Sequence, residues 1–249
     1  MSSDVEVATA ALIRGGEELG VPLADAQLRQ FSQYSAMLIE WNQRFNLTAI
    51  TDPGDIFVRH FLDSLTCLLV IPPAERAKSL RVLDIGSGAG FPGLALAIAF
   101  PHWDVTLLEA TGKKVRFLQA VIEETGISHA HALAGRAEEF AHQPAYRGRF
   151  QIVTARAVAA LPVLLEYGLP FTARGGLLIA PKKGDITAEV EAGTRAAAVL
   201  GAQLATPVPV TLPELSDGRV IVSAKLQHAI ASQYPRAGGA PVRRPLGSP

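Results

Sequence analysis

Residues 82–93 read Val82-Leu83-Asp84-Ile85-Gly86-Ser87-Gly88-Ala89-Gly90-Phe91-Pro92-Gly93, an apolar run that ends in an acid and passes into closely spaced glycines. The apolar pattern of Leu94 to Phe100 follows. Glycine tolerates positive φ angles and the close approach of a ligand, and Pro92 suits a first helical turn, where its missing N–H costs nothing. The stretch therefore predicts a strand, a tight turn, and a helix whose exposed N–H groups face a binding pocket.

Two kinds of cofactor fit this turn. Residues 88–93 have the spacing G-x-G-x-x-G, and Glu109 follows Gly88 by 21 residues, as in dinucleotide-binding proteins. Asp84 argues against a dinucleotide, because its carboxylate would repel a pyrophosphate at about 4–6 Å. S-adenosylmethionine carries an ammonium and a sulfonium and no phosphate, so the sign of the charge favours this methyl donor. An NAD-dependent oxidoreductase remains the alternative interpretation.

The composition is typical of one large domain, or of one domain with a smaller appendage. Apolar residues make up 49% of the 249 residues and charged residues 18%, which supports a substantial core. The single cysteine, Cys67, excludes a disulfide framework within the chain and a cysteine-rich zinc site, and no metal site is predicted. No apolar run approaches the ~18 residues of a membrane span, and no cationic segment leads into an apolar stretch at the N-terminus. We expect a cytoplasmic protein.

The chain divides into three regions. Residues 1–78 are predicted to be helical, because apolar residues recur at helical intervals, with a loop near 42–54. Residues 79–228 alternate strands and helices, which predicts a Rossmann-like α/β domain with helices on both faces of a doubly wound sheet. Residues 229–249 are rich in proline and glycine, and we expect a disordered tail.

The predicted sheet has seven strands and is mostly parallel. Its strands are expected near 81–85, 104–108, 130–134, 151–155, 176–180, 203–210 and 219–226. Helices are expected between them near 92–100, 112–125, 136–141, 160–168 and 186–200. No helix separates the last two strands, so they are predicted to pair as a hairpin that ends the sheet.

Ligands of open parallel sheets bind beyond the carboxyl ends of the strands, so the residues that follow each strand form the candidate site. Glu109, after the second strand, is suited to accept two hydrogen bonds from ribose hydroxyls, and the residues after the third strand are placed for an adenine ring. Arg156 follows the fourth strand, where the reacting methyl group is expected. The candidate cofactor-binding residues are Asp84, Gly86, Ser87, Gly88, Phe91, Glu109, Ala110, Thr111, Ala137, Glu138 and Arg156.

The sequence after the fourth strand also bears on the type of methyl transfer. The run Thr154-Ala155-Arg156-Ala157 lacks the Asn/Asp-Pro-Pro-aromatic pattern usual in enzymes that methylate the amino group of adenine. Methylation at C5 of a pyrimidine needs a cysteine nucleophile, and the apolar surroundings of Cys67 favour a buried, inert thiol. An acceptor that is already nucleophilic, such as N7 of guanine, needs positioning more than a general base. Arg156 and Lys182 are suited to orient a guanine or a phosphate.

The charges are unevenly distributed although the net charge is zero. Between residues 113 and 183, ten Lys or Arg stand against five Glu. A basic face is compatible with binding to a phosphate backbone, and an ordinary solvated surface is the alternative. The same two interpretations apply to Lys113, Lys114 and Arg116 at the start of a predicted helix. His60 and Asp63 lie one helical turn apart, and periodicity alone favours a half-buried histidine and a surface salt link there.

With these residues in view, the chain resembles the RsmG (GidB) family of bacterial small-subunit ribosomal RNA guanine-N7 methyltransferases. The resemblance covers roughly residues 25 to 225 in the family's order. The matching pieces are Trp41-Asn42 to Asn46-Leu47-Thr48-Ala49-Ile50, Arg59-His60-Phe61-Leu62-Asp63-Ser64-Leu65, Val82 to Gly93, Lys113-Lys114-Val115-Arg116-Phe117-Leu118, Arg136-Ala137-Glu138-Glu139-Phe140 and Arg156-Ala157-Val158.

The resemblance implies S-adenosylmethionine as donor and N7 of one guanosine in 16S rRNA as acceptor, with the assembled 30S subunit as substrate. Family cofactor contacts fall on the positions of Gly86, Phe91, Ala137, Glu138 and Arg156. It also raises His60 and Asp63 to candidates for the active-site or RNA-facing surface, and we assign them, with Arg156, as catalytic. The candidate RNA-binding residues are Lys113, Lys114, Arg116, Arg136, Lys182 and Lys183. A non-catalytic RNA-binding assembly factor is a second alternative, and nothing in the sequence demands more than a monomer.

Overall fold

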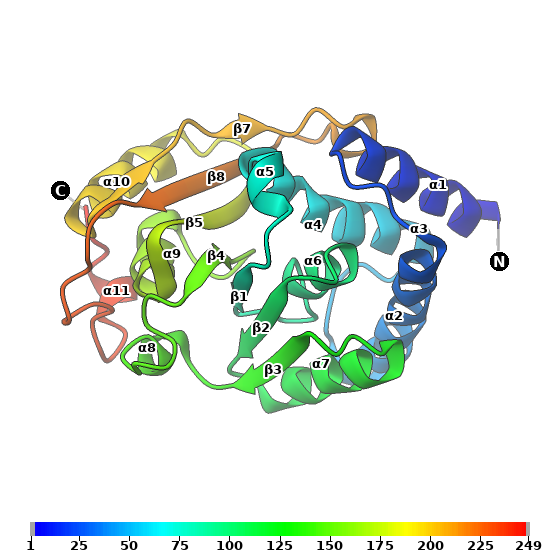
Figure 1. The fold of residues 1–249 in the computed structure, drawn as a ribbon, viewed down its shortest axis with the longest axis horizontal. Coiled ribbons are helices and arrows are strands. Elements are labelled where there is room, and N and C mark those ends of the chain that lie inside the picture. Colours follow the sequence, from blue (N-terminus) through cyan, green and yellow to red (C-terminus); the bar gives the residue numbers. More distant parts are fainter. Residues whose placement is uncertain (1–2, 248–249) are drawn as a thin grey trace.

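One twisted sheet organises the structure (Figure 1). The computed structural model describes residues 3–247. Among them, eight strands form a sheet in the order β3-β2-β1-β4-β5-β8-β6, with β7 paired to β8. The strands are β1 (Arg81–Ile85), β2 (Asp104–Glu109), β3 (Ala130–Ala134), β4 (Phe150–Thr154), β5 (Thr172–Lys183), β6 (Ala202–Leu204), β7 (Val208–Pro209) and β8 (Arg219–Leu226). Strands β1 to β5 run parallel, which confirms the predicted α/β class with a mostly parallel sheet.

The last strands pair antiparallel, as the predicted hairpin requires, but among residues 3–247 the sheet has eight strands rather than the predicted seven. The single strand expected at 203–210 is two short strands, β6 and β7, because Pro207 between them has no N–H to donate to a ladder. Strand β8 lies between β5 and β6 and runs antiparallel to both, with Arg219 opposite Lys183. This insertion brings Arg219 to the carboxyl ends of the parallel strands.

Helices cover both faces of the sheet. They are α1 (Ser3–Glu18), α2 (Asp25–Phe45), α3 (Pro53–Ile56), the π-helical η1 (Phe57–Leu62), α4 (Asp63–Leu65), the 3₁₀ segment η2 (Thr66–Val70), α5 (Pro73–Arg76), α6 (Gly93–Ala99), α7 (Gly112–Thr125), α8 (Ala137–Phe140), α9 (Leu161–Gly168), the 3₁₀ segment η3 (Leu169–Phe171), α10 (Thr187–Val199), the 3₁₀ segment η4 (Pro213–Leu215) and α11 (Ala240–Arg243). Successive β1 residues point to opposite faces, so Val82 joins one buried cluster and Leu83 the other. The first cluster includes side chains of α2, η1, α6 and α7, and the second those of α9 and α10. Within residues 3–247, no helix has the length and apolar character needed to cross a membrane.

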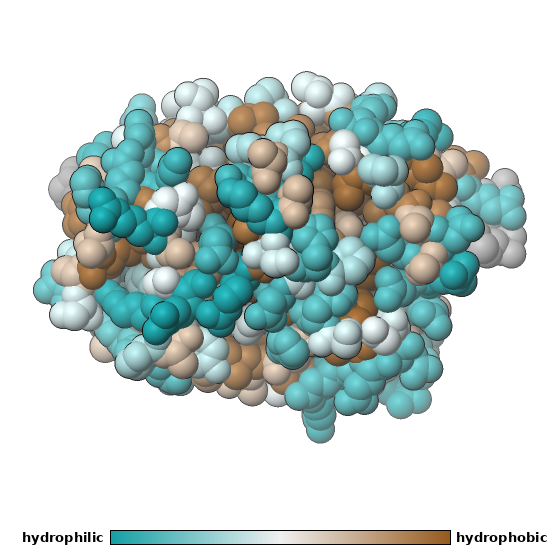
Figure 2. All heavy atoms as spheres, viewed as in Figure 1, coloured by the Kyte–Doolittle hydropathy of each residue, from teal (hydrophilic) through white to brown (hydrophobic). Residues whose placement is uncertain are grey.

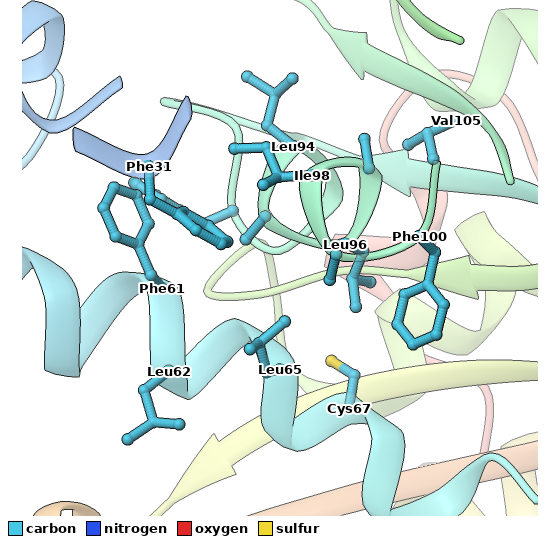
Figure 3. Close-up of a cluster of buried hydrophobic side chains, with 14 of the residues drawn as sticks. Phe31, Phe61, Leu62, Leu65, Cys67, Leu94, Leu96, Ile98, Phe100 and Val105 are labelled. Carbon is cyan, nitrogen blue, oxygen red and sulfur yellow. The ribbon is translucent and has the colours of Figure 1, made fainter. Parts of the chain in front are cut away.

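The N-terminal helices share their core with the sheet. Phe31 of α2 and Phe61 of η1 have ring centroids 4.8 Å apart and lie beside Leu94 and Ile98 of α6 (Figure 3). Cys67 is fully buried in the same cluster, and burial raises the pKa of its thiol far above the ordinary value. A buried protonated thiol is not a nucleophile. Hydrophilic residues cover most of the face shown in Figure 2, with apolar residues in small separate patches.

The C-terminal segment is folded, in contrast to the disordered tail predicted at 229–249. Arg236 donates to both carboxylate oxygens of the fully buried Glu166 of α9, at 2.8 and 2.6 Å. Arg147 donates to three backbone carbonyl oxygens of the segment. These two arginines anchor a stretch that its proline and glycine content predicts to be disordered, and composition carries no information about such anchors. Residues 248 and 249 lie outside the described part of the chain.

Candidate functional site

The glycine turn after β1 is a tight connection to α6. Gly86, Gly88 and Gly90 have φ angles of +63°, +59° and +99°. A Cβ at Gly90 would lie 2.4 Å from the hydroxyl oxygen of Tyr34, which donates to the carbonyl oxygen of Ala89. The turn therefore requires glycine for its conformation and, at Gly90, for close packing beneath it. A Cβ at Gly88 would meet only ordinary contact distances, so this residue faces open space.

Asp84 lies beneath the turn and is not exposed on its open side. Its side chain is fully buried and accepts hydrogen bonds from the Thr154 hydroxyl at 2.9 Å and from the Gly93 amide at 3.1 Å. Burial raises the pKa of Asp84 to about 6, against the lowering effect of these hydrogen bonds. The buried carboxylate fixes the turn and the first residue of α6, in place of the direct contact with a cationic donor that the sequence predicts. Ser87 also turns inward, and its hydroxyl donates to the Asp84 carbonyl oxygen at 2.9 Å.

Glu109, at the end of β2, holds the turn from the neighbouring strand. Its carboxylate oxygens accept hydrogen bonds from the Gly88 amide at 2.9 Å and from the Thr111 amide at 2.8 Å. Ala110 and Thr111 are exposed beside it. Each carboxylate oxygen retains a second lone pair, so Glu109 is able to accept further hydrogen bonds from a ligand.

The end of β3 lies beside Glu109 at the same edge of the sheet. The amide of Gly135 donates to the Glu109 carbonyl oxygen at 3.0 Å, so the chain after β3 passes close to the end of β2. Ala137 is buried and Glu138 is half-buried at the start of α8, while Arg136 before them is exposed. The predicted cofactor-binding residues of the first three strands therefore share one edge of the sheet.

Asp63 joins two arginines from distant parts of the chain in a buried cluster. Arg156, which follows β4, lies 2.5 Å from one carboxylate oxygen, and Arg219 of β8 lies 2.8 Å from the other. The Asp63 side chain is only 3% exposed. The Arg156 guanidinium also lies 5.0 Å from the centre of the Phe91 ring in the glycine turn. Arg156 thus connects the Asp63 cluster to the turn.

His60 is neutral in this cluster. Its ring stacks on Phe91 with centroids 4.2 Å apart, and its Nδ1 lies 3.1 Å from Nη2 of Arg156. Because a guanidinium only donates, Nδ1 accepts and the proton is on Nε2, which lies 2.7 Å from the hydroxyl oxygen of Thr48. Burial, followed by the charges of the neighbouring arginines, lowers the pKa of His60 to about 3. The three residues predicted to be catalytic, Arg156, His60 and Asp63, are therefore in contact, with His60 uncharged near neutral pH.

An open cleft of about 400 Å³ borders this cluster. It is lined by Ile50, Arg59, His60, Asp63, Arg156, Ala157, Pro181, Lys182, Lys183 and Arg219. Five of these side chains are arginine or lysine and one is an aspartate. Each of the five cations is paired with a carboxylate, so the cleft offers N–H donors to a ligand that presents hydrogen-bond acceptors.

Lys182 and Lys183, which are predicted to contact RNA, are both engaged within the chain. Nζ of Lys182 lies 2.6 Å from the Glu189 carboxylate and donates to the Ala159 carbonyl oxygen at 3.0 Å. Lys182 therefore anchors the loop between β4 and α9, and its charge is neutralised there. Lys183 is 59% exposed and pairs with Asp217 at 2.8 Å, so it retains a solvent-facing charge.

The other predicted RNA-binding residues surround the carboxyl ends of β2 and β3. Lys113 and Arg116 are exposed and Lys114 is half-exposed in the first turns of α7. Arg136 is exposed before α8, with Nη1 3.8 Å from the Glu138 carboxylate. These four cations lie on the same edge of the sheet as the glycine turn.

Three contributors to the site are not predicted from the sequence as site residues. Arg219 is 156 positions from Asp63, and its placement depends on the insertion of β8, for which no local signal exists. Thr48 belongs to a stretch that the family resemblance includes, yet its bond to His60 spans a loop. Tyr34 lies within residues 1–78, which are predicted to be helical, and its hydroxyl gives no separate signal there.

Comparison with known proteins identifies the family. The model described as "rRNA small subunit methyltransferase G" matches residues 27–213. The Ribosomal RNA small subunit methyltransferase G of Dehalococcoides mccartyi is 43% identical over 235 residues, which are 94% of this chain and 98% of the relative. The protein of the same name from Geobacillus kaustophilus is 40% identical over 230 residues, 92% and 95% of the two chains.

A solved structure supports the fold. A predicted O-methyltransferase from Agrobacterium tumefaciens superposes with a TM-score of 0.50 at 20% identity, covering 68% of this chain and 91% of the other. The predicted methyltransferase fold and enzyme class are confirmed, as is the resemblance on which they rest. The chain belongs to the family of rRNA small subunit methyltransferase G.

Proposed function

We propose that this protein transfers a methyl group from S-adenosylmethionine to N7 of one guanosine in 16S rRNA, with the 30S subunit as its substrate. The observation that carries the proposal is the contact between the Asp63 cluster and the glycine turn. Phe91 of the turn stacks on His60 and lies under Arg156, so the cleft lined by arginine and lysine side chains opens beside the glycine turn. A base in the cleft would lie near a ligand of the turn.

The residues of the turn and of the next two strands fit S-adenosylmethionine. When bound, S-adenosylmethionine supplies an electrophilic methyl group. The open space at Gly88 admits a ligand close to the backbone, and Glu109 offers carboxylate lone pairs to its ribose hydroxyls. Ala137 and Glu138 would border its adenine ring. The carboxylates of Asp84 and Glu109 at the strand ends would disfavour the pyrophosphate of a dinucleotide.

N7 of guanine needs an oriented lone pair and no proton removal, and the cluster suits that requirement. His60 is uncharged and already donates to Thr48, so it holds Arg156 in place without titrating near pH 7. The Arg156 guanidinium has five N–H donors, of which one bonds Asp63 and one bonds His60. The remaining donors are available for the O6 edge of a guanine. Catalysis then rests on positioning rather than on a covalent nucleophile.

Labelled methyl donor, incubated with 30S subunits from a strain that lacks this protein, tests the proposal. We expect one labelled guanosine in 16S rRNA, with naked 16S rRNA as a second arm that shows whether assembly is required. Arg156→Ala should reduce the rate of transfer by at least a hundredfold, about 3 kcal/mol, while Arg174→Ala at the opposite edge of the sheet should change it little. Donor that binds without being transferred would favour a non-catalytic RNA-binding factor. Tight NADH binding without donor binding would favour an oxidoreductase.

A further inference from the structure

A second groove with aromatic and basic walls lies outside the cleft described above. It has a volume of about 340 Å³ and is lined by Glu40, Trp41, Arg44, Phe45 and Arg116. The Trp41 ring is half-buried, and its centroid lies 5.5 Å from that of Phe45. We call these five residues the Trp41 groove. Packing against the core fixes the indole in place, and one part of it remains open to the groove.

The charge of the Trp41 groove is mainly positive. Arg44 and Arg116 are both exposed, and across residues 3–247 neither has a carboxylate within 4.0 Å. Lys113 is exposed one helical turn before Arg116. Glu40 is the one acidic side chain in the lining. Two cations stand beside two aromatic rings that are tilted by 42° to each other. Proteins bind single-stranded nucleic acid with such combinations of aromatic and cationic side chains.

Short connections tie the Trp41 groove to the candidate active site. Asn42, next to Trp41, accepts hydrogen bonds from the amides of Leu47 and Thr48, and Thr48 bonds His60. On the other wall, Arg116 belongs to the helix that begins directly after Glu109 and Thr111. The groove and the cleft are therefore held in a fixed relation at the same edge of the sheet.

We propose that the Trp41 groove binds an unpaired base of the substrate RNA near the target nucleotide. The base would stack on Trp41 and Phe45, and Arg44 and Arg116 would contact the phosphates on either side of it. This proposal rests on the proposed function, because it takes RNA as the substrate. It goes beyond methyl transfer, because it assigns a second base-binding position. This position would select RNA with an unpaired nucleotide at a fixed distance from the methylated guanosine.

Tryptophan fluorescence tests the proposal independently of methyl transfer. Of the two tryptophans, Trp103 is fully buried and Trp41 lines the groove, so a stacked base quenches Trp41 alone. The probe is a single-stranded hexaribonucleotide of mixed sequence, titrated into the full-length protein. We expect saturable quenching that Arg44→Glu/Arg116→Glu abolishes. Lys225→Glu is the matched control, because Lys225 is exposed at the opposite end of β8, and quenching should persist in it.

A labelled form of the same hexaribonucleotide separates stacking from charge. Trp41→Phe keeps an aromatic surface and should bind with an affinity close to that of the wild type, whereas Trp41→Leu should bind at least about tenfold more weakly. Circular dichroism and the melting temperature show whether each variant is folded. Equal affinities of the folded Phe and Leu variants would overturn the stacking role.

Methyl transfer to 30S subunits gives the second readout. The Arg44→Glu/Arg116→Glu variant should raise KM for the subunit about tenfold, a larger change than any change in kcat, with donor binding intact. An unchanged KM together with unchanged fluorescence would overturn the groove proposal and leave the proposed function standing. Quenching without any methyl transfer to rRNA would overturn the proposed function and leave the binding of an unpaired base by the groove standing. A raised KM for the particle without quenching by the oligonucleotide would assign the groove to a protein of the particle and overturn the RNA proposal.

Discussion

A single buried carboxylate, that of Asp63, sets the geometry of the candidate active site. It accepts hydrogen bonds from Arg156 and Arg219, so both guanidinium groups have fixed positions at the wall of the cleft. Two arginines this close repel each other, and the carboxylate between them offsets that repulsion. In the proposed reaction, Asp63 would therefore act as a positioning residue for Arg156.

Replacement of Asp63 tests how much this arrangement contributes to stability. Asp63→Asn leaves the largely buried guanidinium of Arg156 without a counter-charge and that of Arg219 with Asp217 alone, so the free energy of unfolding should fall by about 3 kcal/mol. Asp55→Asn is the matched control, because Asp55 forms an exposed pair with Arg59 one helical turn away, and it should cost less than about 0.5 kcal/mol. Urea unfolding of the three proteins measures both values. Equal losses for the two variants would contradict the assigned role of burial.

The neutral state of His60 predicts a pH dependence of stability. Its pKa is about 3 in the folded protein and 6.5 ordinarily, so the unfolded chain takes up a proton first as the pH falls. The stabilisation is complete above pH 6.5 and is lost progressively between pH 6.5 and 3, by about 3 kcal/mol at pH 4. His60→Gln should flatten this part of the stability curve, as measured by urea unfolding at pH 4, 5, 6 and 7. Asp84 titrates in the same range in both proteins, so it cancels in the comparison. Parallel curves would rule out a neutral buried histidine.

At the scale of the elements, a strand, a turn and a helix form one rigid support. Asp84 at the end of β1 bonds the first amide of α6, and Glu109 of β2 bonds the turn from the side. Val158, in the loop after β4, would lie 2.8 Å from a Cβ at Gly86, so this loop covers the turn from above. The turn is thus supported on three sides, and its open side is at Gly88.

Alanine substitutions distinguish the tight side of the turn from the open one. Gly90→Ala combines a positive φ with a clash against Tyr34 and should lower the free energy of unfolding by more than about 2 kcal/mol. Gly88→Ala should cost only the conformational strain, about 1–2 kcal/mol, and should weaken donor binding more than it weakens folding. Gly112→Ala, at an unstrained helical position with open space, is the control and should change stability by less than about 1 kcal/mol. Thermal unfolding and donor titration of all three variants would reveal any departure from this order.

At the scale of the whole molecule, the C-terminal segment closes the second core. It is anchored on Glu166, a fully buried carboxylate whose charge is balanced by Arg236. The segment lies against α9, which packs on the sheet behind the loop that carries Arg156. We expect this anchor to contribute to stability.

Loss of this anchor should destabilise the fold without altering the site. Arg236→Ala leaves Glu166 buried without a cation, so the free energy of unfolding should fall by about 3 kcal/mol. Arg195→Ala removes only an exposed hydrogen bond to Gly247 and should cost less than about 1 kcal/mol. Adding Glu166→Gln to Arg236→Ala should recover part of the loss, because the unbalanced charge is then gone. Urea unfolding measures these free energies. If the losses of the two single variants simply add up in the double variant, the two side chains are not coupled.

Local patterns predict most of the elements and the positions where site residues follow the strands. Parallel strands share one edge, so the residues after β1, β2 and β4 could be grouped before any coordinates were known. The insertion of β8 could not be predicted, because it depends on pairing between distant strands, and Arg219 was missed with it. The orientation of Asp84 and the partner of Lys182 also escaped prediction, since both are set by side-chain packing in three dimensions.

The bond between Asp63 and Arg219 has a consequence for the newly made chain. The two residues are separated by 156 positions, and β8 is among the last elements to be synthesised. At about 5–20 residues per second, Asp63 waits roughly 8–30 s for its second arginine. The cleft therefore cannot be complete before β8 has been synthesised, so a nascent chain that has not yet reached Arg219 has no finished cleft.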